Sequence, residues 1–133
     1  MKALPMYTGL IWIVASLLAG GCSSKSGTGN DNAPLLSYSQ LTNRLASTTN
    51  AILLDIRRDD EVARGMIPGA KHIPVEELRQ RIHEIPTNST VIVYCASGKR
   101  VPKALQLLKA AGCTSLFNFV SVTNWKGKLA MPR

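Results

Sequence analysis

The feature that most constrains the fold of this chain is a short apolar run that ends in a cysteine and a small basic loop. The run is Val91 to Tyr94, Cys95 closes it, and Ala96 to Arg100 separates it from a helical pattern over Val101 to Ala111. Backbone N–H groups of such a loop, together with the first turn of the following helix, form a bowl that binds anions. A cysteine at the floor of this bowl is favoured as a thiolate, the nucleophilic form. The run therefore predicts cysteine chemistry on an anionic substrate; the alternative is a buried cysteine that only packs.

The rest of the chain alternates strand and helix patterns. Strands are predicted at 51–54, 71–73, 91–94 and 116–120, and helices after Ser37 or Ser39 as far as Leu45 and at 59–64, 75–85 and 101–111. This alternation is typical of an α/β fold with a parallel sheet. Ligands of such sheets bind beyond the carboxyl ends of the strands. Cys95 stands at one of these ends.

Several motifs in one order resemble the rhodanese (thiosulfate sulfurtransferase) domain family. The matching residues are Leu53-Leu54-Asp55-Ile56-Arg57, Glu61, Gly65-Met66-Ile67-Pro68-Gly69-Ala70, Ile73-Pro74 and Tyr94 to Arg100. The resemblance covers roughly residues 35 to 133. It implies a single α/β domain with a parallel β-sheet flanked by helices on both faces.

The resemblance also implies a mechanism. The Cys95 thiolate would attack the sulfane sulfur of thiosulfate, release sulfite and hold the sulfur as a persulfide, which a thiol or cyanide acceptor then removes. This chemistry needs no general base, so His72 and His83 are not expected to be catalytic. The loop amides would stabilise the thiolate and the persulfide. The candidate anion-binding residues are Ala96, Ser97, Gly98, Lys99 and Arg100.

Some of these side chains have two interpretations. Lys99 either attracts the donor or is a solvated loop lysine, and Arg100 either faces the anion or ties the loop down. Asp55 and Arg57 are expected to support the site structurally, with Asp55 pairing with an arginine beside the active loop.

Two departures from the family pattern concern the surroundings of the loop. Met66 stands where the family commonly has histidine. Val120 and Ser121 replace a Gly-Gly pair that lies five residues before a tryptophan, here Trp125. Because that segment borders the mouth of the site in family members, we expect its shape and substrate access to differ here.

Two other functions remain open. Phosphatases and arsenate reductases on a related fold have five residues between Cys and Arg, whereas Cys95 and Arg100 enclose four, a loop sized for one sulfur and not for a phosphoryl group. A non-catalytic, redox or sulfur-binding module of an envelope assembly is the other alternative. The intact Cys95 loop argues against it, and the altered Val120-Ser121 segment argues for it.

The amino terminus resembles a bacterial lipoprotein signal. Lys2 precedes the apolar stretch Leu10 to Leu18, which is too short to span a bilayer. Small residues then lead to Cys22, with Ala19 where leucine is more common. The resemblance implies removal of residues 1–21 and lipidation of Cys22, and Ser23 fits sorting to the outer membrane. A plain secretory signal or an uncleaved anchor would give export as well.

Residues 22–33 are rich in Ser, Gly and Asn and predict a flexible tether, so that residues 34–133 form one domain. We expect the protein in the bacterial cell envelope, lipid-anchored and facing the periplasm from the outer membrane. Cys95 and Cys113 flank a helix about 16 Å long, too far apart for a disulfide. Cys113 is expected to be a core residue.

The formal charge of +8 is dispersed along the chain. No basic stripe interleaved with aromatic residues indicates nucleic acid, so we expect the charge to attract small anions and anionic lipid headgroups. The histidines and cysteines lack the spacing of metal ligands, and no metal or other cofactor is expected. The sequence names no protein partner.

Overall fold

The computed structural model describes residues 33–133 and places a four-stranded parallel sheet at the centre of the molecule. The strands are β1 (Ala51–Asp55), β2 (Lys71–His72), β3 (Thr90–Cys95) and β4 (Ser115–Ser121). Their order is β2-β1-β3-β4, so β3 lies inside the sheet, and all neighbouring pairs are parallel. The predicted parallel sheet is therefore confirmed.

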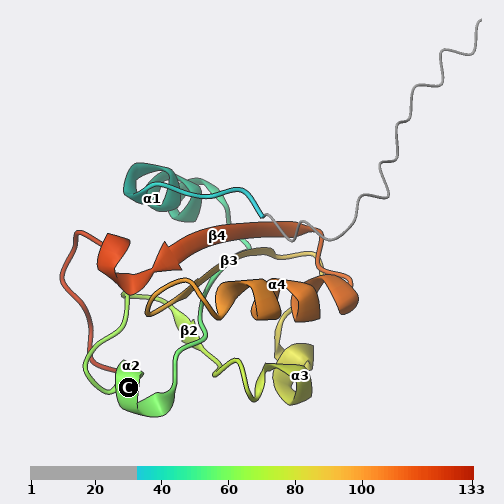
Figure 1. Cartoon of the computed structure of the whole chain (residues 1–133). Coiled ribbons are helices and arrows are strands. Elements are labelled where there is room, and N and C mark those ends of the chain that lie inside the picture. The colour runs from blue at the N-terminus through green and yellow to red at the C-terminus, as the bar shows by residue number, and fades with distance from the viewer. Residues whose placement is uncertain (1–32) are drawn as a thin grey trace, which may run out of the picture.

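Helices cover both faces of this sheet (Figure 1). They are α1 (Tyr38–Ser47), α2 (Asp59–Val62), α3 (Leu78–Arg81) and α4 (Val101–Ala110), with 3-10 turns η1 (Ile82–Glu84) and η2 (Val122–Asn124). Helix α1 lies on one face, and α3 and α4 lie on the other (Figure 1). Ser37 caps α1 by accepting a hydrogen bond from the Gln40 N–H, which decides between the two predicted caps.

The alternation of side chains along β3 divides the core in two. Val91, Val93 and Cys95 belong to the apolar cluster beneath α3 and α4. Ile92 and Tyr94 point to the opposite face and pack in the cluster beneath α1. All five are fully buried, as expected of a strand inside a parallel sheet. The catalytic candidate thus faces α4, and its neighbour Tyr94 faces away.

Besides small shifts at other element ends, three differences from the sequence prediction concern the layout of the domain. The pattern over 75–85 forms only the short helix α3 followed by η1. The segment stops at Ile85, which is extended as expected of a residue that precedes proline, here Pro86. The last strand extends to Ser121, so Val120 and Ser121 end a strand and do not form a loop. Ala33, predicted as the last tether residue, is 7 % exposed and packs in the core.

The predicted signal at residues 1–21, the lipidation site Cys22 and the tether up to residue 32 lie outside the described residues. Among residues 33–133, no helix combines the length and the apolar character needed to cross a membrane.

Candidate active site

Cys95 is the last residue of β3 and its side chain lies at the bottom of the loop that leads into α4. The residue is fully buried. The Gly98 N–H donates a hydrogen bond to the Cys95 Sγ, with 2.9 Å between nitrogen and sulfur. A backbone donor at this distance is placed to stabilise negative charge that develops on the sulfur during a reaction. The loop therefore supplies at least one of the amide contacts that the sequence predicts.

The loop bends at Gly98, where two constraints exclude a side chain. Its φ angle of +85° lies in the left-handed region that favours glycine. A Cβ on Gly98 would also lie 2.7 Å from the Cγ1 of Val120 at the end of β4. Glycine is therefore required both by the backbone and by the side chain that covers it.

Arg100 binds an acidic residue from another element. Its guanidinium donates two hydrogen bonds to Glu61 on α2, both with nitrogen–oxygen distances of 2.7 Å. These bonds, opposed by partial burial, lower the pKa of Glu61 from 4.5 to about 2. Two roles are predicted for Arg100, and in the structure it has the second: it binds the loop to α2. Glu61 is one of the residues that match the family, but the sequence predicts no role for it.

A buried network lies beneath the loop on the opposite face of the sheet. Asp55 accepts hydrogen bonds from Arg57 at 2.7 Å and from the Tyr94 hydroxyl at 2.6 Å. Burial, followed by the charge of Asp55, raises the pKa of Tyr94 well above its usual range. Arg57 also donates to the Gly65 carbonyl at 2.8 Å. The arginine that pairs with Asp55 is thus Arg57. The sequence predicts no role for Tyr94, whose hydroxyl completes the network.

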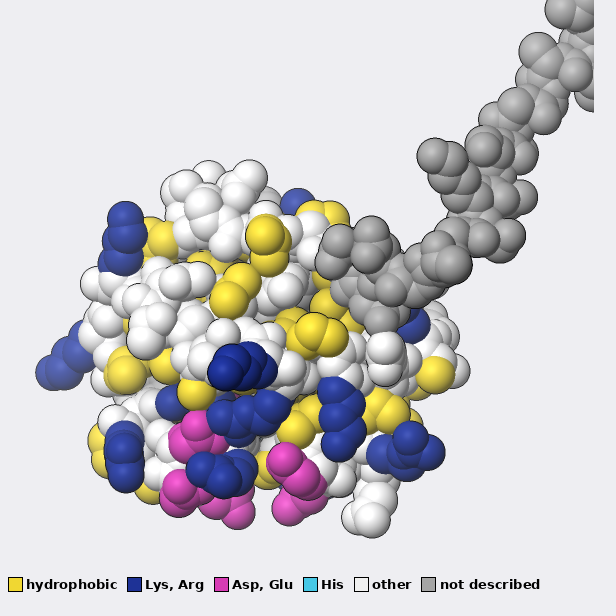
Figure 2. Space-filling view, in the orientation of Figure 1, with side chains coloured by type: hydrophobic (Ala, Val, Ile, Leu, Met, Phe, Trp, Pro, Cys, Tyr) yellow, Lys and Arg dark blue, Asp and Glu magenta, His cyan; other side chains and the backbone are white. Residues whose placement is uncertain are grey.

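The remaining loop side chains differ in exposure. Ser97 and Lys99 are exposed, whereas Ala96 and Arg100 are half-buried. Lys99 is therefore free to meet a solute that approaches from solvent. In the view of Figure 2, basic and acidic side chains lie intermixed over the region of α2 and α3, so the molecule does not present an uninterrupted basic face there.

The two histidines and the second cysteine of the domain lie away from the cysteine loop in sequence and have other surroundings. His72 contacts the Arg57 carbonyl oxygen at 2.7 Å, and His83 is exposed on η1. Cys95 and Cys113 are both free thiols. Burial raises the pKa of Cys113, which keeps it neutral in the core. Within residues 33–133 no group of three or more His, Cys, Asp or Glu side chains is placed to hold a metal ion.

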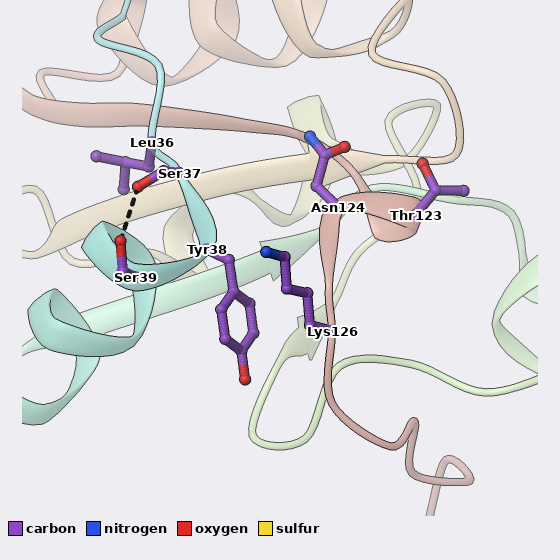
Figure 3. A pocket seen from close by; sticks show the side chains of 7 residues that line it. All are labelled: Leu36, Ser37, Tyr38, Ser39, Thr123, Asn124 and Lys126. Atoms are coloured by element: carbon purple, nitrogen blue, oxygen red, sulfur yellow. Dashed lines mark hydrogen bonds between the residues drawn. The ribbon is translucent and has the colours of Figure 1, made fainter.

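A cavity of about 460 Å³ opens between the start of α1 and η2. Figure 3 shows the side chains of Tyr38 and Lys126 side by side in it, and Thr123 and Asn124 form another part of its lining. None of the residues 96–100 lines this cavity, so it is separate from the cysteine loop.

Comparison with known proteins gives the class to which this fold and loop belong. Residues 37–128 match the family described as "Rhodanese-like domain". A protein of Allochromatium vinosum named sulfurtransferase is 40% identical over 78 residues, which cover 59% of this chain and 73% of that protein. The human thiosulfate:glutathione sulfurtransferase is 34% identical over 101 residues, covering 65% and 87% of the two chains.

Solved structures agree with these sequence matches. A human single-domain sulfurtransferase superposes with a TM-score of 0.61 and 32% identity, over 73% of this chain and all of its own. A rhodanese-like domain protein from Staphylococcus aureus gives a TM-score of 0.67 and 26% identity, over 75% and 99% of the two chains. The chain belongs to the rhodanese-like domain family. It is an enzyme of the sulfurtransferase class, which confirms the resemblance predicted from its motifs.

Proposed function

We propose that the protein transfers sulfane sulfur from thiosulfate, or a related anionic donor, to a thiol or cyanide acceptor through a persulfide on Cys95. The observation that carries the proposal is the Gly98 N–H directed at the Cys95 Sγ at the end of β3. The Cys95 thiolate attacks the outer sulfur of thiosulfate. The sulfur–sulfur bond of the donor breaks, and its electron pair leaves with sulfite.

The second half of the cycle restores the thiolate. An acceptor thiolate or cyanide attacks the terminal sulfur of the persulfide, the bond to Cys95 breaks, and its electron pair returns to the cysteine sulfur. No external oxidant or reductant is consumed. The loop amides act on the negative charge in every state, because the thiolate and the persulfide are both anions.

A mass spectrum of the purified protein tests this cycle. Incubation with thiosulfate should add the mass of one sulfur atom to Cys95, and cyanide should remove it. Cys95→Ser should give no adduct and no thiosulfate:cyanide transfer, while the matched variant Cys113→Ser should give both. Transfer near the wild-type rate in Cys95→Ser would contradict the assignment, and absence of any adduct in the wild type would favour a non-catalytic module.

The loop length separates this proposal from phosphoryl chemistry. Four residues lie between Cys95 and Arg100. We expect aryl phosphates and arsenate to be poor substrates, and phosphatase turnover comparable with sulfur transfer would overturn the size argument.

We also propose that the enzyme acts in the bacterial cell envelope, anchored by lipid on Cys22. A diacylated cysteine supplies two chains, enough for stable attachment where one is marginal. A flexible coil of the length of residues 23–32 would span roughly 16 to 19 Å, which would keep the site near the bilayer and open to small periplasmic molecules. Cell fractionation tests this: wild-type protein should fractionate with the outer membrane, and Cys22→Ala should lose lipid modification. Wild-type protein found wholly in the soluble periplasm would refute the anchor.

A further inference from the structure

The carboxyl end of β4 has an irregular backbone next to the cysteine loop. Val93 pairs with Asn118 and Tyr94 with Val120, so Phe119 is an extra residue in β4. Val120 then adopts a φ of 68°, a left-handed conformation that is unusual for a β-branched residue. The Asn118 side chain accepts a hydrogen bond from the Val120 N–H at 2.7 Å and holds this bend. Strained backbone of this kind persists only where its surroundings fix it, and it is concentrated near functional sites.

The bend brings the next residue, Ser121, opposite Cys95 in the sheet register. The Ser121 hydroxyl donates a hydrogen bond to the Ala96 carbonyl oxygen, the first carbonyl of the loop. A hydroxyl has one proton to donate and two lone pairs that accept. The Thr123 N–H donates to the Ser121 Oγ at 3.1 Å. The Thr123 hydroxyl lies 2.8 Å from the same oxygen and must also donate, because the Ser121 proton is already used.

Ser121, which is 6% exposed, therefore has every hydrogen-bonding position filled, and its direction is fixed. Its contact with Ala96 fixes in turn the plane of the peptide that joins Ala96 to Ser97. In a trans peptide the carbonyl and the N–H point in opposite directions, so a carbonyl held toward β4 directs the Ser97 N–H away from it. The orientation of the first loop peptide is thus set by a side chain from a different strand.

We propose that Ser121 is a positioning residue of the active-site loop, and that its hydroxyl holds the Ala96 peptide in the orientation that keeps the loop amides on the Cys95 sulfur. Val120, at the bend, also packs against this loop, because its Cγ1 covers Gly98. The inference deepens the proposed sulfur transfer and rests on it for its biological meaning. The effect on the thiolate itself can be measured without any sulfur donor.

Ser121→Ala removes the hydrogen bond from the Ser121 hydroxyl to the Ala96 carbonyl oxygen. Iodoacetamide alkylates the thiolate and not the thiol. The alkylation rate of Cys95 at neutral pH, relative to its plateau at high pH and read at this residue by mass spectrometry of the full-length protein, reports how well the loop stabilises the anion, because access of the reagent to this buried side chain cancels in the ratio. We expect this rate to fall about fivefold, the effect of one hydrogen bond, and kcat/KM for thiosulfate to fall in parallel. Thr123→Val keeps Ser121 but removes one of its donors, and should give a smaller decrease in the same direction.

The chain offers a matched control at the other end of the same strands. The Ser115 hydroxyl lies 3.1 Å from the Thr90 hydroxyl of β3, so Ser115→Ala also removes a hydroxyl contact between β3 and β4. We expect this variant to lose thermal stability but to keep the wild-type alkylation rate. Equal alkylation rates in Ser115→Ala and Ser121→Ala, or a faster rate in Ser121→Ala, would overturn the inference.

The two proposals fail differently. If wild-type protein transfers no sulfur but Ser121→Ala still slows alkylation, the positioning role stands and the proposed function falls. If wild-type protein transfers sulfur and Ser121→Ala changes neither rate, the proposed function stands and the positioning role falls.

Discussion

The pair between Arg100 and Glu61 provides a test of how much the loop depends on contacts outside it. Glu61→Gln keeps the size of the side chain but removes its charge. In the native protein both carboxylate oxygens accept from Arg100 at 2.7 Å, and Oε2 also accepts from the Arg58 N–H at 2.9 Å. The Glu61 side chain is 20% exposed and that of Arg100 27%, so the pair is only partly screened by solvent.

The size of the effect follows from the pKa of Glu61, which is lowered from 4.5 to about 2. A shift of one unit corresponds to about 1.4 kcal/mol, so the full shift would represent roughly 3 kcal/mol. Solvent screening of a partly exposed pair reduces this to about 1–2 kcal/mol. For a domain of this size, we expect Glu61→Gln to lower the melting temperature by about 5 to 10 °C at pH 7.

The pH dependence gives the sharper measurement. A carboxylate with a depressed pKa contributes stability that is present above the pKa of the unfolded chain and is lost as the pH falls through the folded value. The difference in melting temperature between wild type and Glu61→Gln should therefore be largest above pH 4.5 and shrink toward zero near pH 2. Thermal unfolding followed by circular dichroism over this range measures it.

Glu84→Gln is the matched control, because it is the same chemical change at a carboxylate whose pKa is also lowered to about 2, by Arg81 and Lys71. It should leave the alkylation rate of Cys95 unchanged, whereas Glu61→Gln should change that rate by releasing Arg100, whose charge acts on the Cys95 sulfur. A melting temperature of Glu61→Gln equal to that of the wild type at pH 7, or a difference that persists at pH 2, would refute the reasoning.

Three other substitutions test separate contacts. Gly98→Ala forces a side chain into a φ of +85° and against Val120, so we expect a loss of about 1–3 kcal/mol in urea unfolding and a steep fall in sulfur transfer. Tyr94→Phe removes the 2.6 Å bond to Asp55 and should lower the free energy of unfolding by about 1–3 kcal/mol, with sulfur transfer per folded molecule maintained. Cys113→Ser places a hydroxyl in the core; it should destabilise the fold in the same assay and retain persulfide formation.

The parts of this structure that the sequence predicts are local. The apolar run to Tyr94, the loop after Cys95 and the helix behind it are consecutive, and strand and helix periodicity together with Gly98 are sufficient to place them. The candidate nucleophile Cys95 and its place at the carboxyl end of a strand follow from that segment alone.

The contacts that hold the loop could not be predicted in this way, because their partners are distant in sequence. Glu61 and Arg100 are 39 residues apart, and Ser121 and Ala96 are 25 apart. The extra residue in β4 carries no sequence signal either, since Phe119 fits a regular strand. The departure at Val120 and Ser121 marked this segment as altered, but only the fold reveals that the alteration contacts the loop.

In the loop of residues 96–100, every second residue contacts another element, and the residues between them face solvent. Ala96 is fixed by Ser121, Gly98 is covered by Val120 and binds the cysteine sulfur, and Arg100 is bound by Glu61. The two residues between them, at positions 97 and 99, are exposed. The partners of the held residues come from β4 and α2, whereas the side chains at 97 and 99 face solvent. The geometry around the Cys95 sulfur and the solvent-facing surface of the loop are therefore set by different residues. Substitutions at 97 and 99 can therefore alter recognition of a sulfur donor while the contacts that position the amides remain intact.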